Sequence, residues 1–593
     1  MNRLGLLLTG ALLTLTGCLK EHTSRLQMEE DAEKSSVRTV GDVAEFQTSG
    51  NVPISGIGLI IGLEGTGGGT PPGPYRQMAE EYLKKNKIEN PGEWLDSLNN
   101  ALVLIGGEIP AGSRRGDRVH IEVTLPPGSK VKSLRGGYLL DTTMTSYAST
   151  GQVRTFLEQK TDVRPVSTGD TLLKGHVLAE AEGPLQVTIK ERENAPVENG
   201  DKIESGVKRA WVWKGAKVKS DQPYYIVMNP DQQRYRMAMN VASRINETFH
   251  GPGTADKIAA ERNADTVVVM IPPQYRGNPG HFLRVVRMIP IDRVDETGSY
   301  RRRLEEQLKQ PETTLSASLR LEALGRGSIT VLSDTMKKTP YPLVRFASAE
   351  GLAYLGEPVA AVELGRLAEQ HPSLQSFCLH ALGSLDESAS SFALQDLLAS
   401  EAPEIRYGAF RALRELDPGS DAARGVRMNN SFWLHRAAAK STPLVHLLSN
   451  SRAEVVVFGD SPSLLPPFSL RAGPDLILTA KPGDTACTVS RFSTRKPQRS
   501  EQCSLDIVDV IKTMADLGAL YSDVAEVLIQ ARDTKALRGS LAIDALPKAV
   551  PIQALAKNAH TDKMMENEAE LLKSAVPEQA GPANVFDRSM NRR

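Results

Sequence analysis

The chain has 593 residues, of which 40% are hydrophobic, 24% are charged and 5% are aromatic, and its 71 Lys and Arg residues balance its 71 Asp and Glu residues. This composition supports packed cores, and the length allows several domains of roughly 100–200 residues each. A net charge of zero and few aromatic rings argue against a nucleic-acid-binding protein, which needs a basic surface and rings that stack on bases.

Residues 1–17 are predicted to be a secretory signal peptide. One arginine precedes an apolar run over residues 4–15, which is shorter than the roughly 20 residues that a membrane-spanning helix needs. The run ends in Leu15-Thr16-Gly17-Cys18, which resembles the lipobox of bacterial lipoproteins. The resemblance implies cleavage before Cys18 and acylation of its sulfur and amino group, with Leu19 favouring the outer membrane. The alternative is an ordinary signal peptide with a chance cysteine.

Residues 18–44 are mostly polar and are predicted to form a flexible tether, because few apolar groups are present to offset the entropy of ordering. Three further cysteines follow. Cys487 and Cys503 lie sixteen residues apart and flank a polar stretch typical of a hairpin loop. Because thiols tend to pair outside the cytoplasm, we expect a disulfide between them. Cys378 falls on an apolar helical face and is predicted to be a buried free thiol.

A glycine-rich run, GIGLIIGLEGTGGG, occupies residues 56–69. A phosphate-binding loop of this kind must follow a strand and open a helix, whose N-terminal amides hold the phosphate. Here the spacing differs from the dinucleotide pattern, no Gly-Lys-Ser/Thr follows, and the next residues are Thr70-Pro71-Pro72-Gly73-Pro74. The first predicted helix, over residues 75–86, comes after them. We therefore expect an apolar strand followed by a glycine-rich turn that needs positive φ.

Several segments in order resemble one family. They are VPISGIGLIIGLEGT (52–66), NALVLI (100–105), EIP (108–110), RGDRV (115–119), KSLRGGYLL (132–140), GHVLAEAEGP (175–184), SRIN (243–246) and GTA (253–255). Together they are similar to the bacterial flagellar P-ring proteins. The resemblance implies a mixed α+β fold for residues 45–300.

The residue patterns of this region agree with that fold. Residues 119, 121, 123 and 125 are apolar and alternate with other residues, as in a half-buried strand, and residues 267–271 form a β-branched run stopped by Pro272. Met237, Val241, Ile245 and Phe249 recur every four residues on one face of a helix. The sequence therefore predicts both helices and strands here.

Between residues 312 and 420 the pattern changes to a repeat. The pairs Leu321/Leu324, Leu352/Leu355, Leu382/Leu385 and Leu413/Leu416 recur at spacings of 31, 30 and 31 residues. Such a period predicts stacked helix pairs that resemble HEAT repeats, an all-α insertion that the P-ring family lacks. The alternative is a generic helical domain. An array of this kind would offer a binding surface for a protein partner that the sequence does not identify.

The P-ring resemblance resumes over residues 428–555. Residues 453–460, AEVVVFGD, and residues 506–528, DIVDVIKTMADLGALYSDVAEVL, are similar to segments near the end of that family. Residues 507, 510, 511, 514 and 517 form one apolar helical stripe, and Asp523 is predicted to cap a second helix, with Glu526 in capping-box spacing. Residues 556–593 are polar and are predicted to be disordered.

No catalytic, cofactor or metal motif is present in the sequence. There is no HExxH, GxSxG or paired CxxC, and Ser-x-x-Lys occurs three times without the motifs that accompany it in β-lactamases. We therefore expect a protein that is not an enzyme and needs no cofactor. Lys130, Lys132 and Arg135 form a basic stretch that could contact peptidoglycan carboxylates or a neighbouring subunit. The alternative is a solvated loop.

The expected function follows from the resemblance, which implies a structural subunit of the flagellar basal-body P-ring in the periplasm. Copies of the chain would form a closed ring around the rod, next to the L-ring and within the peptidoglycan layer. Its lipid anchor would tie it to the outer membrane. The alternative is a non-flagellar envelope lipoprotein scaffold that uses a P-ring module for another assembly.

Overall fold

The structure is a computed structural model of the chain, and its description begins at residue 37. The chain divides into two units, Met1–Val37 and Arg38–Arg593, and the account below concerns the second. The predicted signal peptide, Cys18 and most of the predicted tether lie outside the described residues. These are residues 37–47, 51–85, 87–149, 172–187, 207–249, 257–292, 298–417, 419–420, 423–437, 439–449, 452–473, 475–492, 497–558 and 568–577.

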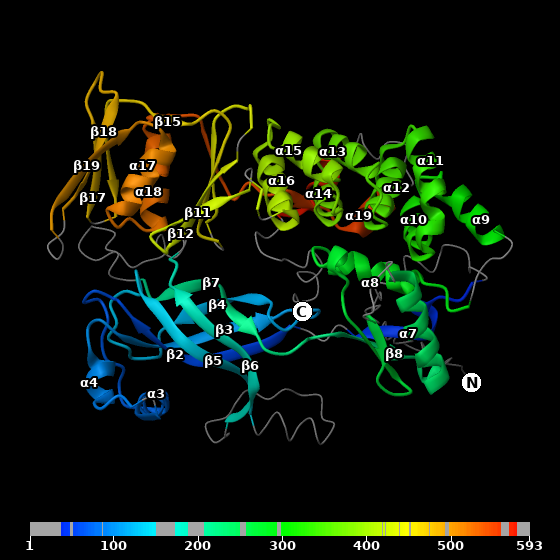
Figure 1. Ribbon diagram of the computed structural model, residues 1–593, viewed down its shortest axis with the longest axis horizontal. Coiled ribbons are helices and arrows are strands. Elements are labelled where there is room, and N and C mark those ends of the chain that lie inside the picture. Colours follow the sequence, from blue (N-terminus) through cyan, green and yellow to red (C-terminus); the bar gives the residue numbers. More distant parts are fainter. Residues whose placement is uncertain are drawn as a thin grey trace, which may run out of the picture. The chain divides into compact units, whose positions relative to one another are not determined.

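The first part of the unit is a closed antiparallel barrel with the strand order β2-β3-β4-β7-β6-β5 (Figure 1). Alternate side chains point inward, and the predicted strand is confirmed by buried Val119, Ile121 and Val123. Ile60 of the predicted apolar strand is also buried in this core. The strands are β2 (Val52–Ile61), β3 (Ala101–Ile109), β4 (Arg118–Thr124), β5 (Tyr138–Ser149), β6 (Leu172–Pro184) and β7 (Arg209–Val218).

Two helices between β2 and β3 cover the outer side of these strands. They are α3 (Pro74–Lys85) and α4 (Pro91–Asp96), and each begins with proline, which suits the first turn because it lacks an N–H that would be unpaired there. Leu83 and Leu95 pack against Leu59 and Leu102. The helix predicted over residues 75–86 is therefore confirmed, and Leu59 and Ile60 face opposite sides of β2.

A four-stranded antiparallel sheet with the order β1-β8-β10-β9 combines β1, which precedes the barrel strands in the chain, with three strands that follow them. The predicted helix face is confirmed in α7, where Val241 and Ile245 are buried, and the predicted strand ends at Val269, before Pro272. The elements are α2 (Val40–Val43), β1 (Ala44–Gln47), β8 (Tyr224–Met228), η2 (Pro230–Gln232), α7 (Tyr235–Phe249), β9 (Ala259–Glu261), β10 (Thr266–Val269), η3 (Pro273–Tyr275) and α8 (Pro279–Met288).

A helical segment spans residues 299–416, so it begins before the predicted residue 312. Helices α10, α12, α14 and α16 pack in sequence and carry the buried leucines 321, 352, 382 and 413, while α11, α13 and α15 form a second layer (Figure 1). The expected helical insertion is thus present, and its likeness to HEAT repeats stays a prediction. Its helices are α9 (Ser299–Leu308), α10 (Thr314–Ala323), η4 (Gly325–Ser328), α11 (Ile329–Lys338), α12 (Pro342–Tyr354), α13 (Ala360–Gln370), α14 (Gln375–Ser384), α15 (Ser388–Leu397) and α16 (Pro403–Leu416).

After the helical segment, strands return in a five-stranded sheet with the order β11-β12-β14-β13-β21 and a four-stranded antiparallel sheet with the order β16-β17-β18-β19. Smaller pairs join β15 to β20 and β22 to β23. The strands are β11 (Gly425–Met428), β12 (Phe432–Ala437), β13 (Leu444–Leu447), β14 (Glu454–Phe458), β15 (Ser463–Leu464), β16 (Phe468–Ala472), β17 (Leu476–Ala480), β18 (Ala486–Arg491), β19 (Arg499–Ser504), β20 (Leu537–Arg538), β21 (Ser540–Ile543), β22 (Lys548–Ala549) and β23 (Val576–Pro577).

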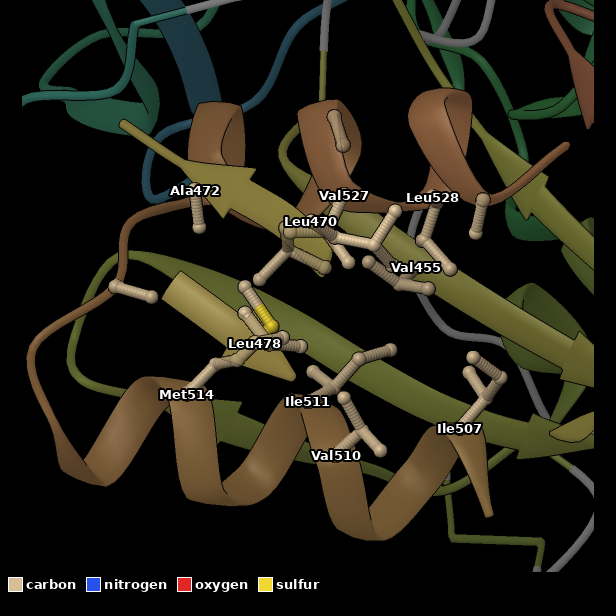
Figure 2. Close-up of a cluster of buried hydrophobic side chains, with 14 of the residues drawn as sticks. Val455, Leu470, Ala472, Leu478, Ile507, Val510, Ile511, Met514, Val527 and Leu528 are labelled. Carbon is tan, nitrogen blue, oxygen red and sulfur yellow. The ribbon is translucent and has the colours of Figure 1, made fainter. Parts of the chain in front are cut away.

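Two helices complete the core of this last part, α17 (Ile507–Asp516) and α18 (Tyr521–Asp533). Figure 2 shows Ile507, Ile511 and Met514 of α17 converging with side chains of β14, β16 and β17, and with Val527 and Leu528 of α18. The predicted stripe is confirmed. The chain is therefore a mixed α+β protein in which a helical segment is inserted between strand-rich regions, as expected.

Two sequence predictions need correction. Asp523 is not the residue that caps α18, because the helix begins at Tyr521 and Asp523 stands in its first turn, where its carboxylate accepts the Leu520 N–H at 2.7 Å. The prediction of disorder over residues 556–593 is wrong for residues 568–577. There α19 (Ile552–Asn558) is followed by α20 (Glu568–Leu571), Leu571 is buried, and β23 pairs with β22.

Candidate functional site

The glycine-rich run forms a loop between β2 and α3, and its backbone N–H groups are already used. Gly67 donates to the Leu98 carbonyl at 2.7 Å, Gly68 donates to the Asn100 carbonyl at 3.1 Å, and Gly65 donates to the Asn99 side chain at 3.0 Å. These are the groups that would have to bind a phosphate. Because they satisfy carbonyls of the chain itself, the loop is built as structure and not as a phosphate cradle.

Glycine is required in this loop for two separate reasons. Gly65 has a φ of +84°, which residues with a Cβ rarely adopt. A Cβ on Gly67 would lie 2.4 Å from the Asn100 carbonyl oxygen, so any side chain there would force the two strands of the loop apart. The expected turn with positive φ is confirmed.

A second loop, residues 125–137 between β4 and β5, packs on the glycine loop. The Lys132 N–H donates to the Thr66 carbonyl at 2.7 Å, and the Lys130 N–H donates to the Gly69 carbonyl at 3.0 Å. The Thr66 hydroxyl donates to the Ser133 carbonyl at 2.9 Å. Two of the sequence motifs, residues 52–66 and 132–140, therefore fold into one unit at the rim of the barrel.

The three basic residues singled out from the sequence do not act together. Lys130 and Lys132 are exposed. The hydrogen bonds from Arg76 lower the pKa of Asp96, and the positive charge of Lys130 lowers it further by a smaller amount. Arg135, in contrast, is only 21% exposed, and its guanidinium lies 2.5 Å from a carboxylate oxygen of Asp523 in α18. Asp523 itself is fully buried. Arg135 therefore pairs within its own chain, and its contact with the wall or a neighbouring subunit stays a prediction.

Arg76 makes a further anchor that the sequence did not reveal. Its guanidinium donates two hydrogen bonds of 2.8 Å to the carboxylate of Asp96 and one of 2.8 Å to the Thr70 carbonyl. One arginine therefore ties α3 to α4 and to the end of the glycine loop. The only indication in the sequence was an arginine on a predicted helix, which is too common to predict these contacts.

A buried polar cluster joins the start of the helical segment to the preceding region. The Tyr275 hydroxyl donates to Glu322 of α10 at 2.6 Å, and His281 Nε2 of α8 lies 2.8 Å from the second Glu322 oxygen. Burial raises the pKa of Glu322 to about 8, against the opposing effects of Tyr275 and Arg284. Burial also lowers the pKa of His281 to about 3. The acid and the imidazole are therefore both neutral at pH 7.

A second buried cluster joins the end of the helical segment to the following sheet. Glu454 of β14 lies 2.8 Å from Arg414 of α16 and 2.7 Å from Arg452, and it accepts a hydrogen bond from the Tyr407 hydroxyl. Burial opposes ionisation of Glu454, but the two arginines outweigh it and hold the pKa of Glu454 at about 2. Arg452 also lies over the ring of Trp213 in β7, 5.6 Å from its centre, so this cluster reaches the barrel.

The predicted disulfide pair is brought together in space. Cys487 of β18 and Cys503 of β19 face each other in antiparallel register, as the predicted hairpin requires, and their sulfur atoms lie 3.3 Å apart as thiols. The bond between them stays a prediction. Cys378 is a buried thiol on α14, as expected, and burial raises its pKa.

The described part of the chain has neither a membrane-spanning helix nor a cluster of metal ligands. None of its helices is both long and apolar enough to cross a membrane. It also contains no group of three or more His, Cys, Asp or Glu side chains placed to hold a metal ion. The residues that stand out are therefore those that join one part of the chain to another.

The comparisons with known proteins agree on one family. The sequence model of the flagellar P-ring protein matches residues 39–298. The flagellar P-ring protein 1 of Bradyrhizobium diazoefficiens is 24% identical over 266 residues, which cover 44% of this chain and 61% of the relative. That of Dechloromonas aromatica is 27% identical over 237 residues, covering 39% and 57%.

A longer match reaches most of one relative. The flagellar P-ring protein of Yersinia pseudotuberculosis is 24% identical over 358 residues, which cover 59% of this chain and 87% of the relative. The chain otherwise spans about 60% of the length of the first curated relatives that it matches. The glycine loop and the KSLRGGYLL motif both lie inside residues 39–298.

Proposed function

We propose that the chain is a structural subunit of the basal-body P-ring, because residues 39–298 match the sequence model of the flagellar P-ring protein. The observation that carries the proposal is the family match to the region where two motifs pack on each other through backbone hydrogen bonds. Their amides hold the fold together instead of a ligand. The role is mechanical, and no residue is assigned to catalysis.

Copies of the chain would meet side by side in the periplasm to form a ring around the rod, next to the L-ring. Such a contact is heterologous, because a patch on one copy meets a different patch on the next, and a rotation that closes gives a ring. Arg135 and Asp523 support this role indirectly. They hold the barrel loop against α18, and a ring subunit must keep its contact surfaces in fixed relation.

Electron microscopy of basal bodies tests the proposal. A strain lacking this gene should lose swimming, and its basal bodies should lack the ring, with recovery on re-expression of the full chain. Basal bodies that keep an intact ring without this protein would rule out the P-ring role.

The second candidate is a non-flagellar envelope scaffold, and one observation favours it. The helical segment over residues 299–416 lies wholly outside the family match, which ends at residue 298. Helical repeats commonly bind other proteins. Normal swimming together with loss of another envelope assembly in the deletion strain would support this candidate over the first.

Two contacts outside the ring complete the proposal. Cys18 would carry the lipid that ties the subunit to the outer membrane, and Cys18→Ser should then release the protein from membrane fractions. Lys130 and Lys132 are exposed and could contact peptidoglycan. The double exchange to Glu should then reduce sedimentation with purified cell walls, whereas unchanged sedimentation would leave them as a solvated loop.

The paired thiols would form a disulfide in the oxidising periplasm. The alternative is that they stay reduced, and thiol alkylation followed by mass spectrometry of the native protein separates the two states. A pair fully alkylated without prior reduction would exclude the bond.

A further inference from the structure

The helical segment carries an unusually exposed apolar face on two neighbouring helices. Val362 of α13 is 75% exposed and Phe392 of α15 is 63% exposed. Each stands ten residues after one of the repeating leucines, 352 and 382, so they occupy equivalent positions in successive repeats. Single exposed apolar side chains are common, but a pair in the same register of adjacent helices forms a continuous face.

Helices α13 and α15 pack directly against each other, so this face is shared (Figure 1). A Cβ built on Gly365 of α13 would lie 3.6 Å from the Cβ of Ala393 in α15. Small residues at this contact let the two helices approach closely. Val359, just before α13, is 40% exposed and extends the apolar surface. We call Val359, Val362 and Phe392 the α13–α15 face.

The sequence around the α13–α15 face is strongly acidic. Between residues 357 and 404 there are eight Asp and Glu residues and one basic residue, Arg366, and none of the eight is buried. Arg366 and Arg345 of α12 both pair with Glu363, at 2.5 Å and 3.3 Å, so seven carboxylates remain beside this compensated one. The surroundings therefore favour an occupant that combines apolar side chains with positive charge.

One segment of this chain has that chemistry. Residues 578–593 read EQAGPANVFDRSMNRR, with Val585 and Phe586 followed by three arginines and one aspartate. The segment lies outside the described residues. An apolar pair next to a basic stretch is the complement of an apolar pair surrounded by carboxylates.

The last described residue, Pro577, lies in β23, which pairs with β22, and β22 packs against α14 of the helical segment. Glu568 of α20 accepts the Ser373 N–H at 2.7 Å and lies 3.9 Å from His371, the residue that ends α13. Val362 stands on the same helix, about 14 Å from His371 at a rise of 1.5 Å per residue. Residues 578–585 span up to about 26 Å when extended, and packed helices lie about 8–10 Å apart, so a segment that leaves the α14 side is long enough to extend to α13.

We propose that residues 585–593 bind the α13–α15 face of the same chain. Val585 and Phe586 cover Val362 and Phe392, and the arginines lie among the surrounding carboxylates. The bound segment shields an apolar face that would otherwise promote association. A foreign basic partner could reach the helical segment only by displacing it.

The experiment compares the full chain with a variant that ends at Pro577. A fluorescent peptide of residues 578–593 should bind the shortened variant at least tenfold more tightly than the full chain, whose face is already covered. Hydrogen exchange in α13 and α15 should be several-fold slower in the full chain. Raising the salt concentration should weaken the peptide's binding, because the arginines contribute to it.

Substitutions identify the surface. Phe392→Ser in the shortened variant should weaken peptide binding at least tenfold, whereas Leu98→Ser, at a 60% exposed residue outside the helical segment, should leave it unchanged. In the full chain, Phe586→Ser should speed hydrogen exchange in α13 and α15. This variant keeps the full length, so it separates loss of the apolar contact from the effect of truncation. Thermal melting of each variant checks that it folds.

Four results would overturn the proposal: no peptide binding, equal binding to the full and shortened chains, equal binding of a scrambled peptide, or binding that Phe392→Ser does not affect. Protection that grows with protein concentration would also overturn it. That result would place the segment on another copy instead of its own chain.

Discussion

The two ends of the helical segment are held by buried glutamates of opposite character. Glu322 at the start has only hydroxyl and imidazole hydrogen-bond partners, and burial raises its pKa to about 8. Glu454 at the end has two arginines within 3 Å, and its pKa is held at about 2. Both side chains are almost completely buried. The difference shows that partners, and not burial alone, decide whether a buried carboxyl is charged.

The two junctions should therefore respond differently to substitution. At the first junction Glu322 and His281 are neutral, with the Arg284 guanidinium 3.2 Å from His281 Nδ1, so Glu322 tolerates replacement by another neutral group of similar shape. The second is an ionic network, in which removal of one charge leaves others buried without compensation. The predictions below test this contrast, beginning with the largest effect.

Glu454→Gln should lower the free energy of unfolding by about 3–5 kcal/mol, because it leaves Arg414 and Arg452 without their shared countercharge. Urea denaturation followed by circular dichroism measures the change. The matched control is Glu501→Gln, whose partner Arg499 is 58% exposed, and whose exchange should change stability by no more than about 0.5 kcal/mol. Equal effects of the two exchanges would contradict the ionic description of the second junction.

Acidification from pH 7 to pH 5 should loosen the second junction. Burial lowers the pKa of His435 and of His446 to about 4, against an ordinary value of 6.5. The unfolded chain therefore binds more protons below pH 6.5, and stability falls as the pH falls. Each histidine therefore lowers the free energy of unfolding by about 2 kcal/mol at pH 5. The negative charge of Glu454 raises the pKa of both histidines, but burial has the larger effect.

The first junction should respond differently over the same range. His281 loses stability below pH 6.5 in the same way, but the raised pKa of Glu322 means that the folded state binds more protons between pH 4.5 and 8. Stability from Glu322 therefore increases as the pH falls, and the two effects oppose each other. As the pH falls, α16 and β14 should lose protection against hydrogen exchange before α8 and α10 do, once the intrinsic pH dependence of exchange is corrected for. Loosening in the reverse order would contradict these charge states.

Asp523→Asn should have an intermediate effect of about 1–3 kcal/mol, since Arg135 keeps some contact with water and loses only one buried charged partner. Asp523 also accepts the Leu520 N–H in the first turn of α18, a bond that Asn can still accept. Arg135→Gln should have a similar effect, and the double variant should lose little more than either single variant. Additive losses would mean that the two residues do not act as a pair.

Most of the fold could be predicted from the sequence where a period or a breaker residue is strong. The alternation at Val119–Val123, the stripe of α17 and the 30-residue leucine period all match the structure. The errors arose where the local sequence pattern was compatible with two different structures. Asp523 has the residue type of a cap, but Leu520 is the cap residue of α18. In the segment that was expected to be disordered, Leu571 is buried and Glu568 accepts the Ser373 N–H of the helical segment.

The site was less predictable, because its important contacts join residues far apart in the sequence. Arg135 and Asp523 are separated by 388 residues, and nothing in either neighbourhood indicates the other. The glycine loop was different. Its conformational demand is local, so the sequence could predict its turn, whereas its packing on residues 129–133 could not be predicted.

Glu322→Gln should have the smallest effect, under about 1 kcal/mol at pH 7, because glutamine imitates a protonated carboxyl. Its carbonyl oxygen can accept from the Tyr275 hydroxyl and from His281 Nε2, which lie 2.6 Å and 3.1 Å from the same Glu322 oxygen, while Arg284 donates to His281 Nδ1. Glu322→Ala is the control, since it leaves the Tyr275 hydroxyl buried without an acceptor and should lower stability by about 1–3 kcal/mol. Chemical denaturation of both variants distinguishes them. If Gln were as harmful at this position as at Glu454, then Glu322 would be charged, and the two junctions would work in the same way.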